Sequence, residues 1–205
     1  MFGGEDFTLG DTLVNDIGNE LVLTDYAIIL SDFRLIDSGV EYTIADSIQV
    51  NCGSTDGTEN YEFNDLAYIS KSSSFVSIGS WKKPGQFEEV SFLVGLSDCY
   101  HDAGIDNIQD DSKLADLDTL YSAGLGYKTL SFEFSDSITI DFVGKSSTIG
   151  ASQIISASTV AGSTFLLDLN IDFGVWFSDI DLQEDIELTK AKLIRNASEA
   201  IVITQ

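Results

Sequence analysis

Residues 129–142 read TLSFEFSDSITIDF. Apolar side chains alternate with polar ones at Leu130, Phe132 and Phe134, and the alternation resumes at Ile140 and Phe142. Because successive side chains of a β-strand point to opposite faces, this pattern predicts two strands with one buried face and one wet face. Half-buried strands are typical of antiparallel sheets, since parallel strands covered on both faces read as continuous apolar runs.

The same alternation recurs at residues 89–94 and 165–173, and clusters of turn-forming residues separate the apolar segments. The stretch from Leu21 to Leu35 is apolar on both faces in places, which predicts a deeply buried central strand that bends between two sheets. We therefore expect an all-β, antiparallel β-sandwich. The side chains expected to face its core include Val90, Phe92, Phe132, Ile140, Leu167, Leu169 and Ile171.

Two segments have helical spacing, so one or two short helices are expected beside the strands. Residues 112–121 place Leu114, Leu117, Leu120 and Tyr121 at three- and four-residue spacing, with Asp110, Asp111 and Ser112 available as caps. Residues 186–201 form the second candidate, although residues 201–204, at the end of the chain, resemble a strand. Without repeats or a dividing linker, residues 1–205 are predicted to form a single domain, as all-β sandwiches of this length often do.

The chain is strongly acidic, with 34 Asp and Glu against 10 Lys and Arg and a net charge of −24. Such a charge repels phosphate backbones and anionic membranes, so nucleic acid is not an expected partner. It attracts cations and basic proteins, and it also suits a saline habitat. No apolar run approaches the roughly 20 residues of a membrane-spanning helix.

Export is expected from the composition, which is rich in Ser, Thr, Gly and Asp, and from the single cysteine pair. The first residues, Met1 to Asp6, have neither the basic start nor the apolar centre of a signal peptide. Either the protein is cytosolic, or its signal sequence is absent here. We expect the second, which implies a periplasmic or cell-surface protein that a lipid anchor could precede.

Cys99 and His101 lie in the segment Cys99-Tyr100-His101-Asp102, which holds three potential metal donors. The spacing lacks the paired pattern of a strong metal motif. In an exported chain the favoured interpretation is a disulfide between Cys52 and Cys99, with His101 exposed in a loop. A copper site that includes His101 is the alternative.

Two acidic clusters could supply the oxygen ligands that calcium prefers. Neither has the spacing of a calcium-binding helix-loop-helix, so solvated acidity without a specific ion is the alternative. The first cluster contains Asp102, Asp106, Asp110 and Asp111, and the second contains Asp179, Asp181, Glu184 and Asp185.

Four segments, in order along nearly the whole chain, support a family resemblance. They are residues 7–35, which end in a Ser31-Asp32-x-x-Leu signature, residues 85–95, residues 120–133 and residues 168–177. Together they resemble the MbnP-like family of periplasmic or lipid-anchored β-sandwich proteins from copper-acquisition operons. The resemblance rests on these motif residues: Ser31, Asp32, Gly95, Tyr121, Gly126, Tyr127, Glu133 and Trp176.

The resemblance implies a non-catalytic binding module, but the copper-site residues differ. Tyr121 and Ala123 occupy positions where the copper-linked members carry tryptophans, and His101 is the only histidine. Copper(I) prefers thiolate, thioether and imidazole donors, which leaves Cys52, Cys99, His101 and Met1 as the whole supply. We therefore expect the copper site to be lost or altered.

An enzyme is not expected, because no Gly-x-Ser-x-Gly elbow accompanies the single histidine. The alternative to a binding module is an acidic, calcium-stabilised structural or adhesive subunit of the cell surface. Such a subunit would bind a protein partner or associate with itself.

Overall fold

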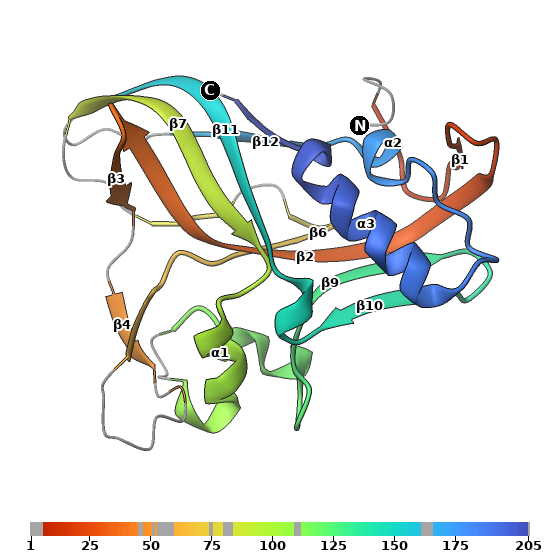
Figure 1. The fold of residues 1–205 in the computed structure, drawn as a ribbon, viewed down its shortest axis with the longest axis horizontal. Helices are drawn as coiled ribbons and strands as arrows, with labels where there is room; N and C mark the ends of the chain where they lie inside the picture. Colours follow the sequence, from red (N-terminus) through yellow and green to blue (C-terminus); the bar gives the residue numbers. More distant parts are fainter. Residues whose placement is uncertain are drawn as a thin grey trace.

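The computed structural model describes residues 6–44, 47–50, 52, 60–73, 76–79, 84–108, 112–160 and 166–204. Within these ranges the chain forms antiparallel sheets with few helices, which confirms the sandwich-like all-β fold (Figure 1). The path through the main sheet is β10-β9-β2-β7-β11, with β1, β3, β6 and β8 attached to it. These strands are β1 Thr12–Val14, β2 Glu20–Asp37, β3 Val40–Thr43, β6 Ala67–Ser70, β7 Gly85–Val94, β8 Tyr121–Ser122, β9 Gly126–Phe134, β10 Thr139–Val143 and β11 Ile149–Thr159.

Strand β2 is the long central strand that the apolar stretch predicts. Its first half pairs with β9 and its second half with β7, and the register shifts between Ser31 and Arg34. Asp32, inside this shift, has a positive φ of 55°, which bends the strand. Figure 1 shows β2 crossing the molecule, with β9 and β10 beside one end and β3, β7 and β11 beside the other.

A second layer covers the main sheet. It contains the two-stranded sheet of β12 (Asp168–Ile171) and β13 (Ile201–Thr204), the short helix α2 (Phe173–Trp176) and the helix α3 (Ile186–Ala200). Trp176 and Phe177 pack edge-on against Phe132 of β9, at centroid distances of 5.1 and 5.2 Å. These contacts, together with aliphatic side chains from both layers, form the larger of two apolar cores.

The smaller core lies under the helix α1 (Asp98–Ala103). It gathers side chains from β4 (Ser47–Val50), which pairs with β5 (Asn60–Phe63), and from α1 and β9. Three short 3₁₀ turns complete the described structure: η1 (Ile105–Asn107), η2 (Ala115–Leu120) and η3 (Lys145–Ser147). None of the helices in the described ranges is long and apolar enough to span a membrane.

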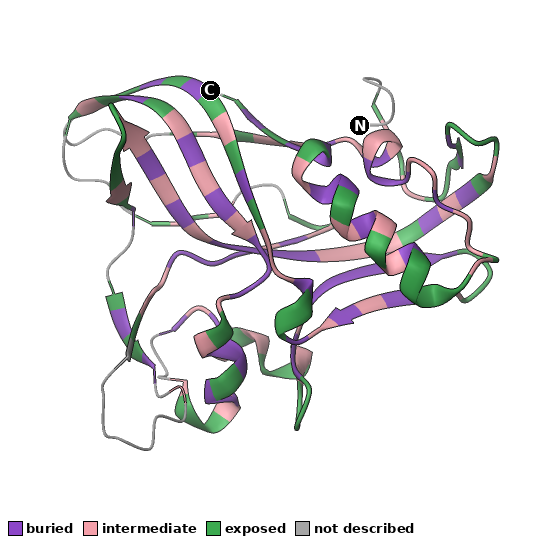
Figure 2. Cartoon of the chain, in the orientation of Figure 1, coloured by how far each residue is buried: buried purple, intermediate pink, exposed green. Residues whose placement is uncertain are grey.

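The predicted core residues face inward. Val90, Phe92, Phe132, Ile140 and Ile171 are buried, and Figure 2 shows the alternation of buried and more exposed positions along β7. Leu167 and Leu169 are partly buried and pack against the larger core.

Two expectations about local structure need correction. The strand predicted over 165–173 ends at Ile171, because the Asp172 carboxylate accepts the N–H groups of Gly174 and Val175 and caps α2. The segment 112–121 contains a short helix, as expected, but it is the 3₁₀ helix η2 over Ala115–Leu120 and not an α-helix. The second predicted helix is confirmed as α3, which ends where β13 begins at Ile201.

Candidate functional site

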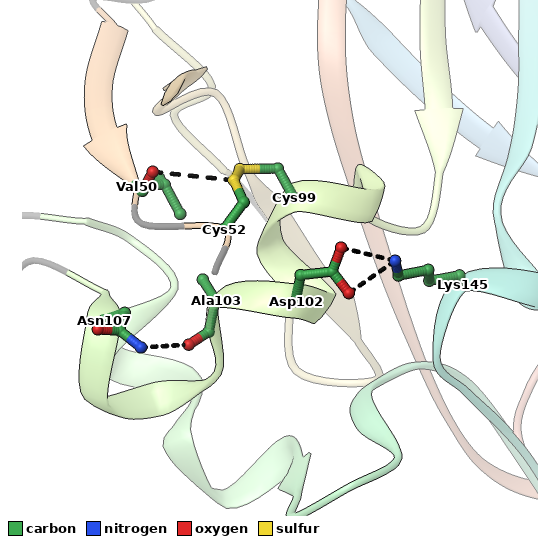
Figure 3. Close-up of a disulfide and its surroundings, with 7 residues drawn as sticks. All are labelled: Val50, Cys52, Cys99, Asp102, Ala103, Asn107 and Lys145. Carbon is green, nitrogen blue, oxygen red and sulfur yellow. Dashed lines mark hydrogen bonds and ion pairs between the residues drawn. A yellow bond between two sulfur atoms is a disulfide. The ribbon is translucent and has the colours of Figure 1, made fainter. Parts of the chain in front are cut away.

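Cys52 and Cys99 form a disulfide, as predicted, with 4.9 Å between their Cα atoms. The bond joins the segment after β4 to α1, across a sequence separation of 47 residues (Figure 3). Both cysteines pack against the smaller core. Such a bond is compatible with an oxidising compartment, and it removes both thiolates from the supply of metal ligands.

The prediction that His101 is exposed in a loop is wrong. His101 lies on α1, which turns its ring toward β9, and the residue is 7% exposed. Its Nδ1 accepts the backbone N–H of Tyr127 at 3.3 Å, which leaves the proton on Nε2. Gly126 permits this approach, because a Cβ there would lie 2.8 Å from Nδ1. Burial lowers the pKa of His101, so the ring is neutral near pH 7.

The first acidic cluster is only partly within the described residues. Asp102 forms an ion pair with Lys145 at 2.6 Å, visible in Figure 3. Asp106 is exposed on η1, and Asp110 and Asp111 lie outside the described residues. The carboxylate of Asp102 is therefore already paired with a lysine. That the rest of this cluster binds calcium stays a prediction.

The acidic residues of the second cluster form hydrogen bonds and ion pairs that stabilise the turn before α3 and the start of that helix. Asp181 accepts the N–H of Gln183, and Asp185 caps α3 by accepting the N–H groups of Glu187 and Leu188. Asp179 and Glu184 form ion pairs with Lys192, and Asp179 also pairs with Arg195. Across the described ranges, no three or more His, Cys, Asp or Glu side chains are grouped so that they could hold a metal ion.

Several of the family-motif residues have structural contacts near the bend of β2. The hydroxyl of Ser31 donates to the carbonyl of Gly95 at 2.8 Å, and Asp32 forms an ion pair with Arg34. Gly95 has a φ of 118°, and a Cβ there would lie 3.0 Å from the hydroxyl of Thr148. These contacts hold β2 against the exit of β7.

The other motif residues lie on both cores. Tyr127 is buried in the smaller core, where its ring packs 5.0 Å from that of Tyr121. Trp176 is buried in the larger core and donates its indole N–H to the carbonyl of Leu193 at 3.0 Å. Glu133 is exposed on β9. The motif residues therefore do not meet at one site.

The main concave feature of the described structure is a cavity of about 1120 Å³ between the main sheet and the β12–β13 layer. Its lining comes from β2, β6, β7, β11, β12, β13 and α2, together with residues 7–9, 44, 71, 73, 76–79, 160, 166 and 167. The apolar side chains of this lining are Phe7, Leu9, Tyr26, Leu30, Phe33, Leu35, Ile44, Ala67, Ile69, Val76, Ile78, Val90, Val160, Leu166, Leu167, Leu169, Ile171, Phe173 and Ile203.

The apolar lining reaches the surface at Val160 and Leu166, which are 67% and 57% exposed. Large apolar side chains that are exposed beside a cavity form a surface that an apolar ligand can contact. We call this place the mouth of the cavity.

Sequence reasoning did not find the cavity. Period-two alternation correctly marked Val90, Leu167 and Leu169 as inward-facing, but it cannot tell whether two facing layers fill the space between them. The exposure of Val160 and Leu166, which defines the mouth, is known only from the structure, so no sequence signal pointed to it.

Comparisons of this chain with protein families, with curated proteins and with solved structures find no match.

Proposed function

We propose that this chain is an exported, non-catalytic binding module of the MbnP-like type, and that its ligand is an apolar molecule held in the cavity between the layers. The observation that carries the proposal is the cavity itself. Its volume of about 1120 Å³ slightly exceeds the usual volume of small-molecule sites, which is about 300–1,000 Å³. Burial of an apolar ligand there would gain roughly 25 cal/mol for each Å² removed from water.

Other features support a binding role over the alternatives. The single imidazole is buried and bonded to the backbone of Tyr127, which is a poor position for a general base. The described carboxylates of the second acidic cluster are used in caps and ion pairs, which offers no support for a calcium-built surface subunit. The disulfide supports export, because such bonds persist in oxidising compartments.

Titration with a neutral apolar dye such as Nile red tests the proposal. We expect saturable one-to-one binding to the wild-type chain, with a blue-shifted emission. Leu167→Trp, just before β12, and Ala67→Phe, in β6, put larger side chains into the cavity. Each should weaken dye binding about tenfold or more. Two variants are used because Ala67 is buried and its replacement could impair folding.

The matched control is Leu125→Trp, because Leu125 is exposed and lies outside the cavity lining. Its binding should equal that of the wild type. Dye binding that is unsaturable, or that is the same in all three variants and the wild type, would count against the proposed site.

A further inference from the structure

The charged side chains of the cavity lining are Arg34, Lys71 and Asp168, and they differ in whether a counter-charge accompanies them. Arg34 forms an ion pair with Asp32, and its guanidinium lies 4.5 Å from the centre of the Phe63 ring. Lys71 forms an ion pair with Asp25 at 2.5 Å. Both positive charges are therefore already compensated.

Asp168 has no such compensation. It is the first residue of β12 and is exposed, and it forms no ion pair with any residue that the structure describes. It lies two residues from Leu166, one of the two apolar residues of the mouth. An apolar lining thus has an uncompensated carboxylate close to its entrance.

The charge of the whole chain acts in the same direction. A net charge of −24 raises the concentration of cations near the surface and repels anions. An anionic head group would enter against this field and would find Arg34 and Lys71 occupied by carboxylates. A cationic head group would be drawn to the mouth and could pair with Asp168.

We propose that the ligand of the cavity is a cationic amphiphile, whose single apolar chain lies between the layers and whose positively charged head group pairs with Asp168 at the mouth. This inference rests on the proposed function, because it assigns the ligand class of the same cavity. Since Asp168 is exposed, its pairing with the head group should favour cationic over neutral ligands but supply only a small part of the affinity. An exposed ion pair typically changes a dissociation constant about two- to fivefold.

Three probes with the same ten-carbon chain test this assignment by displacing bound Nile red: decyltrimethylammonium, decanol and decanoate, each below its micelle concentration. We expect the cation to displace the dye at about two- to fivefold lower concentration than decanol, and decanoate to be the weakest. Asp168→Asn should abolish the difference between the cation and decanol. Asp106→Asn, which removes the charge of an exposed aspartate outside the lining, should preserve it.

The outcomes separate this inference from the proposed function. If the dye binds but decanoate competes as well as the cation, or if Asp168→Asn leaves the order unchanged, the cationic assignment is overturned and the cavity remains a binding site. Cation binding that persists in Ala67→Phe would reflect the acidic surface and would also overturn it. If the dye itself does not bind to the wild type, the proposed function fails first.

Discussion

The buried carboxylate of Asp65 accepts a hydrogen bond of 2.6 Å from the backbone N–H of Phe33. Its other oxygen accepts the N–H of Asp32 at 3.0 Å, so one side chain satisfies both backbone donors at the bend of β2. Where a central strand bends, its backbone N–H groups lose their hydrogen-bond partners on the neighbouring strand. A buried N–H group without a partner lowers the stability of the fold by about 1–3 kcal/mol. Asp65 therefore stabilises the point where β2 passes from β9 to β7.

The same carboxylate should make stability depend on pH. Burial raises the pKa of Asp65 from its ordinary 3.8 to about 6, against the lowering effect of the two N–H groups, while Asp32 raises the pKa slightly and Arg34 lowers it. A raised pKa means that the folded chain favours the protonated form. The contribution is therefore fully present below pH 3.8 and is lost as the pH rises through about 6.

We predict that lowering the pH from 7 to 4.5 raises the unfolding free energy of the wild type by about 2 kcal/mol relative to that of Asp65→Asn. The asparagine side chain of this variant is neutral at both pH values. Urea denaturation at both pH values measures this difference. Asp136→Asn, an exposed aspartate in the β9–β10 turn, is the control and should show little change. A difference between wild type and Asp65→Asn that does not vary with pH would refute the assignment.

The disulfide should contribute substantially to stability. Closing a loop of 47 residues restricts the unfolded chain, which the chain-entropy description values at about 4 kcal/mol. We predict that the double variant Cys52→Ala, Cys99→Ala loses about this much unfolding free energy in urea. Thiol titration of the denatured, unreduced wild type should find no free thiol, and two thiols per chain would contradict the bond.

Copper(I) should not form a tight one-to-one complex with this chain. Cys52 and Cys99 are bonded to each other, and the Nδ1 of His101 already accepts the N–H of Tyr127. Titration against a competing chelator, with and without prior reduction, measures the affinity. Tight binding by the oxidised wild type that His101→Phe abolishes would restore the copper role that the family resemblance implies.

Salt should raise the stability of the chain, because a net charge of −24 repels itself and ions screen that repulsion. We predict that the melting temperature rises with NaCl, and that calcium at equal ionic strength adds no more than NaCl does unless an acidic cluster binds the ion. A larger effect of calcium would indicate a specific site, since an ion bound only by the native state stabilises it by mass action. Asp102→Asn and Asp181→Asn would then show which acidic cluster holds the ion.

Particular residues show why the sequence predicts the fold better than the site. The alternation at Phe132 and Ile140 reports one property, burial of one strand face, which the backbone geometry converts directly into a sheet. The end of β12 depended instead on a side-chain cap by Asp172, a local competition that periodicity does not record. The burial of His101 depended on a helix of six residues, too short to give a periodic signal.

The candidate site was harder to predict from the sequence than the fold, because the cavity depends on how closely the two layers pack. Asp168 appears in the sequence as one of 34 acidic residues, and only the fold places it in the lining of a cavity. Likewise, the compensation of Arg34 by Asp32 requires the bend of β2, where Asp32 adopts a positive φ.

The most direct test of the central claim is methyl NMR of the labelled chain during titration with decyltrimethylammonium. We predict that the shifted signals, and the nuclear Overhauser contacts to the ligand chain, belong to lining residues such as Val90, Leu167 and Ile203. Leu96 and Leu114, in the smaller core, should not shift. Contacts confined to the exposed Leu125, or shifts only in the smaller core, would contradict binding in the cavity between the layers.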